Sequence, residues 1–544
     1  MAPQRVSDLG LRIADSITGA FRNEPLTDFA REISRVKIQE AIDEVGKQCN
    51  AKYPLVIDGQ EIPTHNWIES MNPSHRTQVV GRCGQATKIQ ADAAIKAAAK
   101  AFPDWRDTEP AERAEHLFKA AEIMRQRRFE LAAWAVLECG KPWREADADI
   151  AEAIDFCNYY GKEMLRMAVA QRRDTPGEDN EYFYEPRGVT VVIAPWNFPL
   201  AILCGMTTAA LVTGNTVIMK PAEQSSVIAA KFMEVLQAAG FPSGVVNYLP
   251  GIGEEIGPTL VNHPEVALIA FTGSLSVGLL INREATITPI DKQHHVKRVI
   301  AEMGGKNAVI VDADADLDEA VRGVVDSAFG YQGQKCSAGS RAIVLEPIYD
   351  QFLARLIETT KSLTVAPAES PGCSVGPVID GEARDRILSM IEKGKREARL
   401  VYAAEIGELQ HEGWYIGPHI FADVPETSML AQEEIFGPVL SVMKATSLDE
   451  ALRIANGTKY ALTGGIFSRS PKNIEQVKKR FRVGNLYINR KITGALVDRQ
   501  PFGGFKLSGI GSKAGGPDYL LQFVLPRTIT ENTMRRGFAP EVRG

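Results

Sequence analysis

The chain contains 544 residues, of which 44% are hydrophobic and 24% are charged, and its formal net charge is −6. The composition predicts a globular protein, and the length, which exceeds what one hydrophobic core supports, predicts two or three domains. The acidic balance, without any basic run, excludes nucleic acid as an expected partner.

The cysteines indicate a reducing compartment. Seven of them are spread along the chain, and no two form a C-x-x-C pair. An odd number at wide spacing predicts free thiols in a cytoplasmic protein, without a metal site. The N-terminus also lacks a continuous apolar segment followed by a cleavage site, so secretion is not expected.

The first 50 residues predict an N-terminal arm of amphipathic helices, because their apolar side chains recur at helical spacing. These side chains are Leu9, Ile13, Ile17, Phe21, Phe29, Ile33, Ile38 and Ile42. The segments 91–102, 111–139 and 147–160 predict further helices. The polar segment 172–184 suits either a loop or a protruding hairpin.

The apolar stretch 188–219 is long enough to raise the question of a membrane span. Pro195, Asn197, Pro199 and Asn215 divide it into pieces of strand and helix length. We therefore assign it to the core and expect no membrane partner.

Short β-branched runs alternate with helices from residue 188 onward. The predicted strands are 189–194, 216–219, 245–249, 268–271, 299–301 and 308–311. Continuous apolar strands separated by helices predict parallel, doubly wound sheets. The second series of strands and helices, which extends to about residue 511, predicts a second α/β domain.

Cys336 stands out among the cysteines because it lies between small and polar residues, in G-Q-K-C-S. A cysteine chosen at random is most often an inert, buried apolar residue. Cys139, Cys157 and Cys204 fit that description, since they lie in apolar helical patterns. Cys336 does not, and it is the candidate nucleophile.

Two further candidates follow predicted strands. Glu302 precedes paired glycines in E-M-G-G-K, at the position where open α/β sheets bind ligands, although a solvated strand-end glutamate fits equally well. Asn197 lies between two prolines in P-W-N-F-P. Its amide suits an oxyanion donor, and it also suits a cap for the following helix.

A nucleotide site is indicated less strongly. Lys220 and Glu223 form K-P-A-E after a strand, where an acidic residue and an ammonium can bind ribose hydroxyls, although such a tetrapeptide is usually a surface turn. The segment 251–257, G-I-G-E-E-I-G, has one residue too many for the standard dinucleotide fingerprint.

The motifs taken together, in their order, carry a specific resemblance. They are P-W-N-F-P, K-P-A-E, F-T-G-S, E-M-G-G-K, G-Q-K-C, E-E-I-F-G-P and P-F-G-G-F-K-x-S-G. Through them residues 50–530 resemble the aldehyde dehydrogenase superfamily. The resemblance implies that Cys336 is the nucleophile, Glu302 the general base, and Asn197 an oxyanion donor shared with the backbone N–H of Cys336.

The same resemblance implies NAD as the cofactor. Its contacts would be Lys220 and Glu223 to the adenosine ribose, Ser274 to the pyrophosphate, Glu434 to the nicotinamide ribose, Phe436 beside the nicotinamide, and Trp196 in the cofactor cleft. The carboxylate at 223 would repel a 2′-phosphate, so NAD is expected to be preferred over NADP.

Within the superfamily, three features are similar to the branch that oxidises L-glutamate γ-semialdehyde, the Δ1-pyrroline-5-carboxylate dehydrogenases. They are Lys335 and Ser337 beside the nucleophile with Arg341 after them, the loop T-G-A-L at 493–496, and the helical extension before residue 50. By this resemblance Ser337 and the amides of Gly494 and Ala495 hold the substrate α-carboxylate, and Glu152 lies near its amine.

The resemblance also implies a domain plan of a variant Rossmann NAD-binding domain, a catalytic domain and two smaller parts. The expected ranges are an N-terminal helical arm at 1–50, the NAD-binding domain at 51–168 and 188–302, the catalytic domain at 303–511, and a small β oligomerisation element at 169–187 and 512–544. A homo-oligomer follows by analogy, and a proline dehydrogenase is a candidate partner.

Three alternatives stay open at this point, and the intact Cys336, Glu302 and Asn197 argue against one of them, a non-catalytic structural relative. An aldehyde dehydrogenase for another acidic aldehyde, such as succinate semialdehyde, would suit the same anion-binding turn. A cysteine-dependent acyl hydrolase without a redox step would need a histidine base. His294 and His295 are the histidines nearest the motifs in sequence.

Overall fold

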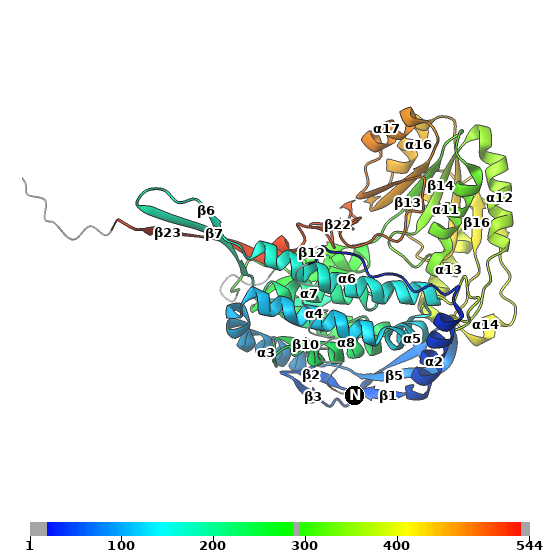
Figure 1. Ribbon diagram of the computed structural model, residues 1–544. Coiled ribbons are helices and arrows are strands. Elements are labelled where there is room, and N and C mark those ends of the chain that lie inside the picture. Colours follow the sequence, from blue (N-terminus) through cyan, green and yellow to red (C-terminus); the bar gives the residue numbers. More distant parts are fainter. Residues whose placement is uncertain (1–18, 288–292, 535–544) are drawn as a thin grey trace, which may run out of the picture.

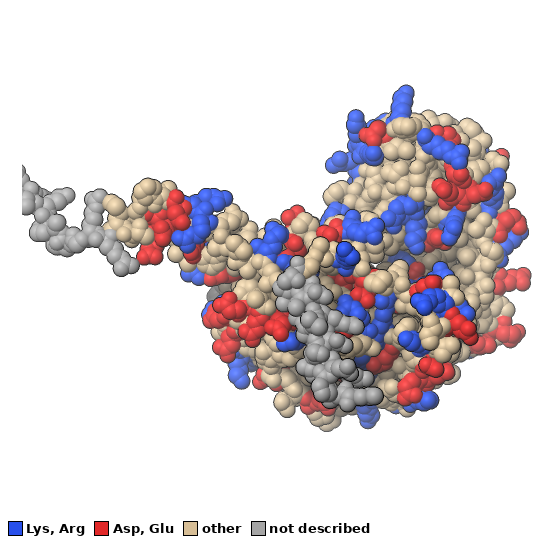
Figure 2. All heavy atoms as spheres, in the orientation of Figure 1, with Lys and Arg blue, Asp and Glu red and all other residues tan. Residues whose placement is uncertain are grey.

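The computed structural model describes residues 19–287 and 293–534. Two α/β lobes and a long β ribbon that projects from one of them make up the molecule (Figure 1). Figure 2 shows acidic and basic side chains interspersed over both lobes and a hollow between the ribbon and the upper lobe. In the described ranges no helix combines the length and apolar character that a membrane crossing needs.

The first lobe is built on an eight-stranded sheet in the order β22-β12-β11-β8-β9-β10-β2-β3. Its five central strands are parallel, as predicted. At its edges β2 pairs antiparallel with β10, β3 antiparallel with β2, and β22 antiparallel with β12. The strands are β22 (Gly509–Ile510), β12 (Arg298–Glu302), β11 (Val266–Thr272), β8 (Val189–Ile193), β9 (Thr216–Lys220), β10 (Val246–Tyr248), β2 (Leu55–Ile57) and β3 (Gln60–Ile62).

Apolar side chains on both faces of these strands explain why helices cover both sides. Val191 packs in one core cluster and Val192, the next residue, in another. One side carries α3 (Lys88–Asp107), α9 (Gly253–Asn262) and α10 (Leu275–Glu284). The other carries α4 (Pro110–Gln126), α5 (Arg128–Cys139), α6 (Trp143–Met167), α7 (Ala201–Val212) and α8 (Ser226–Ala238). The stretch 188–219 is therefore core, as predicted.

The second lobe has a seven-stranded sheet in the order β15-β16-β17-β14-β13-β19-β20, parallel except for β15. Its strands are β15 (Arg399–Ala403), β16 (His419–Ala422), β17 (Val439–Ala445), β14 (Gly339–Leu345), β13 (Asn307–Val311), β19 (Thr463–Phe467) and β20 (Asn485–Ile488). Its helices are α11 (Leu317–Phe329), α12 (Tyr349–Lys361), α13 (Gly381–Gly394), α14 (Leu409–Glu412), α15 (Met429–Gln432), α16 (Leu448–Asn456) and α17 (Pro471–Arg480).

The ribbon resolves the choice left open for 172–184 in favour of a hairpin. It contains β6 (Gln171–Arg172), β7 (Glu178–Pro186) and the C-terminal strand β23 (Val524–Asn532), which pairs with β7 of the same chain. Smaller sheets are formed by β1 (Ala51–Tyr53), β5 (His75–Gly84) and β4 (Trp67–Asn72), and by β18 (Tyr460–Ala461) and β21 (Phe505–Lys506).

The N-terminal arm differs from its prediction. The helix expected around Leu9, Ile13 and Ile17 lies outside the described residues. Residues 20–28 form no helix, so Phe21 is not helical, and Phe29 lies in a turn ahead of α2 (Glu32–Gln48). α2 agrees with the predicted pattern at Ile38 and Ile42, which are buried, but not at Ile33, which is exposed.

One further segment departs from the predicted plan. Gly509 and Ile510, which the plan gives to the second domain, pair with β12 of the first sheet. Glycine permits this approach, since a Cβ on Gly509 would lie 2.9 Å from the carbonyl oxygen of Ala301.

Candidate active site

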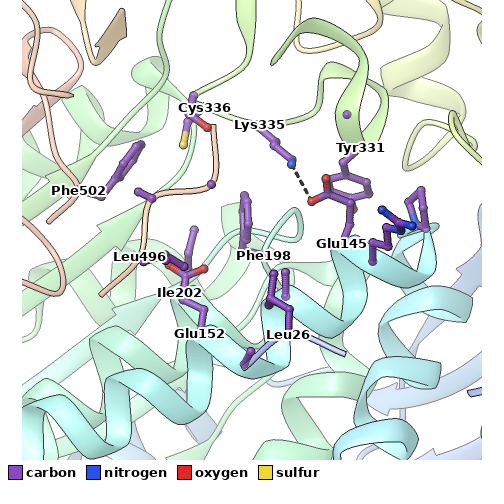
Figure 3. A pocket seen from close by; sticks show the side chains of 18 of the residues that line it. Leu26, Glu145, Glu152, Phe198, Ile202, Tyr331, Lys335, Cys336, Leu496 and Phe502 are labelled. Atoms are coloured by element: carbon purple, nitrogen blue, oxygen red, sulfur yellow. Dashed lines mark hydrogen bonds and ion pairs between the residues drawn. The ribbon is translucent and has the colours of Figure 1, made fainter. Parts of the chain in front are cut away.

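A cavity of about 850 Å³ contains the predicted nucleophile. It is lined by parts of α6 and α7, the end of β12, the loop before β14, the loop 494–502 and the N-terminal segment ahead of α2. Cys336, Glu302, Ser337, Gly494, Ala495 and Glu152 all line it. Figure 3 shows the Cys336 sulfur and the Glu152 carboxylate approaching the cavity from opposite sides.

The loop that carries Cys336 is fixed by strained backbone and buried hydrogen bonds. Tyr331 and Gln332 both adopt left-handed backbone conformations, which side chains rarely do without surrounding constraint. The Tyr331 hydroxyl donates to the carbonyl of Cys139 at 2.8 Å, and Gln332 Nε2 donates to the carbonyl of Pro377 at 2.6 Å. The nucleophile is thus held in one place before substrate arrives.

Asn307 fixes the same loop from the next strand, and the sequence reasoning missed it. Its Nδ2 donates to the carbonyls of Cys336 at 2.7 Å and Ala338 at 2.9 Å. Gly305 allows the two segments to meet, because a Cβ there would lie 2.8 Å from the Cys336 carbonyl oxygen. The asparagine directly after E-M-G-G-K was the available signal.

The environment of Cys336 disfavours its thiolate. Burial, followed by the charges of Glu434 and Glu302, raises the pKa of the thiol to about 12. The neutral thiol is therefore the resting form at neutral pH in the free protein. A positive charge entering the site would favour the nucleophilic thiolate.

Glu302 is poised as a base. It is the last residue of β12, and its Oε2 is buried without a hydrogen-bond partner. Burial raises the pKa of this carboxyl to about 8, and the positive charge of Lys513 opposes that rise. A buried carboxylate with a free oxygen and a pKa near neutrality suits proton removal from a water molecule.

Lys513 is a second residue that the sequence reasoning missed. Its Nζ donates to the carbonyls of Gly484 at 2.6 Å and Gly503 at 3.0 Å, and to Asn485 Oδ1 at 2.8 Å. Gly503 lies beside Glu302, because a Cβ on Gly503 would be 3.1 Å from Glu302 Oε1. Lys513 therefore fixes the backbone against which the Glu302 carboxylate rests.

Asn197 is buried beside the Cys336 loop. Its Nδ2 donates to the carbonyl of Gln334 at 3.1 Å, and its own carbonyl accepts from Lys141 Nζ at 2.7 Å. The capping role considered for it is wrong, since Asp149 accepts from the first amides of α7, those of Leu200 and Ala201. An amide carries two N–H groups, so one remains to meet an oxyanion.

The residues expected to hold the substrate also line the cavity. Gly494 has a left-handed backbone (φ +74°), which turns the loop at that point. Burial raises the pKa of Glu152 to about 8. Glu145, which the sequence reasoning missed, accepts from Lys335 Nζ at 2.6 Å (Figure 3).

The predicted ribose-binding pair follows β9. Lys220 is its last residue, and its Nζ lies 3.2 Å from Glu223 Oε1. The same carboxylate oxygen accepts from the backbone N–H of Gly253 at 2.8 Å, where α9 begins. Segment 251–257 thus meets Glu223, although it is not a standard fingerprint.

Ser274 caps the N-terminus of α10, and its hydroxyl accepts from the Val277 N–H at 3.4 Å. The side chain is exposed, directly after β11. A helix N-terminus after a parallel strand is where open sheets bind phosphates.

Glu434 packs so closely against Gly304, the first glycine of E-M-G-G-K, that only glycine fits there. Its Oε1 accepts from the Gly305 N–H at 2.9 Å, and a Cβ on Gly304 would lie 2.0 Å from its Oε2. Trp196 and Phe436 meet edge to face with ring centroids 5.6 Å apart. None of the cofactor-binding candidates is among the described residues that line the cavity.

Histidine chemistry finds no support at this site. No histidine is among the described residues that line the cavity. His294 Nδ1 instead lies 2.9 Å from Glu265 Oε1. Among the described residues that line the cavity, the acyl-hydrolase alternative therefore has no histidine base for Cys336.

Comparison with known proteins places the chain in a family. Residues 61–529 match the aldehyde dehydrogenase family. A 1-pyrroline-5-carboxylate dehydrogenase of Geobacillus kaustophilus is 51% identical over 513 residues, which cover 94% of this chain and 99% of that protein. A 1-pyrroline-5-carboxylate dehydrogenase from Thermus with bound NAD is 48% identical, with a TM-score of 0.92, over 95% of this chain and 99% of that one.

A larger protein also contains this architecture. Proline utilization A from Bdellovibrio bacteriovorus is 54% identical with a TM-score of 0.94, and the match covers 96% of this chain. This chain spans 54% of that longer one. From the family match and these full-length likenesses it follows that the chain belongs to the aldehyde dehydrogenase family.

Proposed function

We propose that the protein oxidises L-glutamate γ-semialdehyde, which forms from Δ1-pyrroline-5-carboxylate, to L-glutamate with NAD. One observation carries the proposal. The cavity holds the Cys336 thiol and the Glu302 carboxylate together with Ser337, Gly494 and Ala495, which suit a small carboxylate. The relatives that are 51% and 48% identical over 94% and 95% of this chain add independent support.

The Cys336 thiol first releases its proton to water, and its Sγ then adds to the aldehyde carbon. The new alkoxide of the thiohemiacetal accepts hydrogen bonds from Asn197 Nδ2 and the backbone N–H of Cys336. When bound, NAD supplies a positive charge that favours the thiolate and accepts a hydride from the aldehyde carbon, so a thioester remains on Cys336.

Hydrolysis of the thioester falls to Glu302. Its ionised carboxylate removes a proton from water, whose oxygen attacks the acyl carbon and displaces the Cys336 sulfur. The products are the γ-carboxylate of glutamate and a free thiol. The unpartnered Glu302 Oε2 supports this role, because no competing hydrogen bond has to be broken.

The other end of the substrate defines its class. The Ser337 hydroxyl and the amides of Gly494 and Ala495 hold the α-carboxylate, and Glu152 faces the α-amino group. A bound ammonium would stabilise the ionised form of Glu152 and lower its pKa from about 8. An aldehyde that lacks the amino group leaves this buried carboxyl without a cationic partner.

The residues present fit NAD. Glu223, held by the Gly253 amide and Lys220, offers a carboxylate to ribose hydroxyls, and Ser274 opens a helix for the pyrophosphate. Because Gly304 has no Cβ, the Glu434 carboxylate fits against it, and from there it would bind the nicotinamide ribose. Trp196 and Phe436 would flank the nicotinamide end.

Cofactor choice gives the first prediction. With NADP in place of NAD at equal concentration, initial rates are expected to fall at least about tenfold, because the Glu223 carboxylate repels the 2′-phosphate. Glu223→Gln should bring the ratio of the NAD rate to the NADP rate closer to one, since it removes the negative charge and keeps the shape of the side chain. Equal rates of the wild-type protein with both cofactors would refute the assignment of Glu223.

Glu302 gives a prediction on pH. Because hydrolysis needs its ionised form and its pKa is about 8, kcat is expected to rise with pH through a midpoint near 8. Lys513→Met removes a positive charge that favours this ionised form, so the midpoint moves to higher pH.

Steady-state profiles of wild type, Lys513→Met and Lys506→Met measure this shift. Lys506 is a matched control, since its ammonium also binds backbone carbonyls, those of Asn456 and Thr458. A midpoint that stays in place in Lys513→Met, or moves to lower pH, would contradict the assigned role of Lys513.

Parallel assays of NADH formation with pyrroline-5-carboxylate and with succinate semialdehyde test the proposed substrate. The first is expected to give the higher kcat/KM, because its amino group meets Glu152. A higher kcat/KM with succinate semialdehyde would transfer the assignment to that aldehyde. Hydrolysis of activated esters without NADH from any aldehyde would favour the acyl hydrolase.

Assembly and setting complete the proposal. The ribbon exposes Tyr182, Leu525 and Ile529, and such an apolar surface supports a homo-oligomer in which it contacts a second copy. The free state of all seven cysteines supports a cytoplasmic enzyme. The match to part of proline utilization A supports a proline dehydrogenase as the partner that supplies the substrate.

A further inference from the structure

The N-terminal segment ahead of α2 forms a wall of the aldehyde cavity. Residues 21–28 form neither helix nor strand, and Glu24, Leu26 and Phe29 line the cavity. Figure 3 shows Leu26 near α6, at the side of the cavity away from Cys336. We call residues 19–31 the strap.

The strap is bound to α6 through two buried carboxylates. The Thr27 amide and hydroxyl donate to Asp147 at 2.8 and 2.5 Å, and the Glu24 amide donates to Asp155 Oδ1 at 2.6 Å. Asp147 and Asp155 are each only 2% exposed. Because buried carboxylates need hydrogen-bond donors, these contacts hold the strap in one position.

Asn23 extends this attachment to the loop that holds the substrate. Its Nδ2 donates to Asp155 Oδ2 at 2.9 Å and to the carbonyl of Val497, also at 2.9 Å. Val497 lies two residues after Ala495, in the same loop as Gly494. One side-chain amide thus ties the loop 494–497 to α6, the helix that carries Glu152.

We propose that Asn23 is a positioning residue for substrate recognition, which sets the distance between the carboxylate-binding amides and Glu152. This inference rests on the proposed function, because it assigns the loop 494–497 to the substrate α-carboxylate. Asn23 touches no reacting atom. Its loss should therefore weaken the binding of substrates that contact both the loop and Glu152. It should not weaken the binding of an aldehyde that contacts only Cys336.

The test compares Asn23→Ala and the similarly sized Asn23→Leu with wild type and with Thr27→Val. Thr27→Val removes a hydroxyl that binds Asp147 and leaves the Asn23 contacts intact. Each protein is assayed with pyrroline-5-carboxylate and with propanal, which has neither carboxylate nor amine. L-Glutamate binding, measured by calorimetry, adds a readout that is independent of turnover.

In both Asn23 variants, KM for the semialdehyde and Kd for L-glutamate are expected to rise about tenfold, as for loss of a partly buried hydrogen bond. The semialdehyde kcat should change less than KM. Values for propanal in these variants, and all values in Thr27→Val, should stay near wild type.

If the Asn23 variants lose activity equally with both aldehydes, the inference is overturned and Asn23 has a general structural role. The same holds if Thr27→Val raises KM for the semialdehyde and not for propanal, as expected for the Asn23 variants. An unchanged KM for the semialdehyde and an unchanged Kd for L-glutamate in the Asn23 variants would also overturn it. If wild type oxidises propanal but not the semialdehyde, the proposed function fails instead.

Discussion

Cys336→Ser is expected to reduce NADH formation from the semialdehyde at least about 10³-fold, because a hydroxyl is a far weaker nucleophile than a thiolate. The side chain keeps nearly the same volume, and the loop is fixed by Asn307 and Gln332 through backbone carbonyls, so the fold should persist. Steady-state rates and the thermal unfolding midpoint measure the two effects separately.

Cys373 offers a matched control within the same cavity. It also lines the cavity, and its Sγ donates to the carbonyl of Ala366 at 3.3 Å. Cys373→Ser is expected to retain near wild-type rates, since no base or oxyanion donor is assigned to it. If activity survives in Cys336→Ser and disappears in Cys373→Ser, the nucleophile is Cys373 and the assignment of Cys336 is wrong.

Glu302→Gln is expected to lower steady-state turnover by about 10²- to 10⁴-fold, the usual contribution of a general base. The earlier oxidation step does not need this carboxylate, so a burst of NADH close to one equivalent per active site should remain. Rapid mixing of enzyme, NAD and semialdehyde measures the burst. The slow phase that follows reports hydrolysis of the thioester.

Glu433→Gln is the control for loss of a carboxylate near the site. Glu433 is exposed and binds Lys459 at the surface, so its removal should leave both phases unchanged. Loss of the burst in Glu302→Gln would move the role of Glu302 from hydrolysis to the first step. Wild-type turnover in Glu302→Gln would remove it from the mechanism.

Much of the first lobe could be predicted from local patterns. The strands β8, β9, β11 and β12 are apolar on both faces, and such runs read directly as buried parallel strands. Motifs at their carboxyl ends then fall at one edge of the sheet, because parallel strands end together. This geometry is why Glu302 and Asn197 could be expected at one edge of the sheet, whereas their place beside Cys336 followed from the resemblance to the aldehyde dehydrogenase superfamily.

The strap could not be predicted, because its structure is held by distant side chains. Residues 21–28 have apolar positions that continue a helical pattern, yet they form no helix. Asp155 and Asp147 instead accept from the amides of Glu24 and Thr27. Lys335 and Glu145 are likewise separated by 190 residues. Such pairs follow from the packing of the lobes, which no local periodicity encodes.

The return of β22 to the first sheet has a similar cause. Only two residues pair, Gly509 with Glu302 and Ile510 with Ala301. Two residues carry no strand pattern, and the pairing depends on a glycine that tolerates close backbone contact. A domain boundary drawn at residue 511 from element order alone therefore gives β22 to the second domain, although it pairs with the sheet of the first.

Mass spectrometry of the trapped acyl-enzyme tests the central claim most directly. Glu302→Gln, mixed with NAD and the semialdehyde and quenched in acid, is expected to carry one γ-glutamyl group on the peptide that contains Cys336. The adduct should be absent without NAD, because the thioester forms only after oxidation. A burst of NADH with no adduct on Cys336, or with the adduct on another cysteine, would contradict the account.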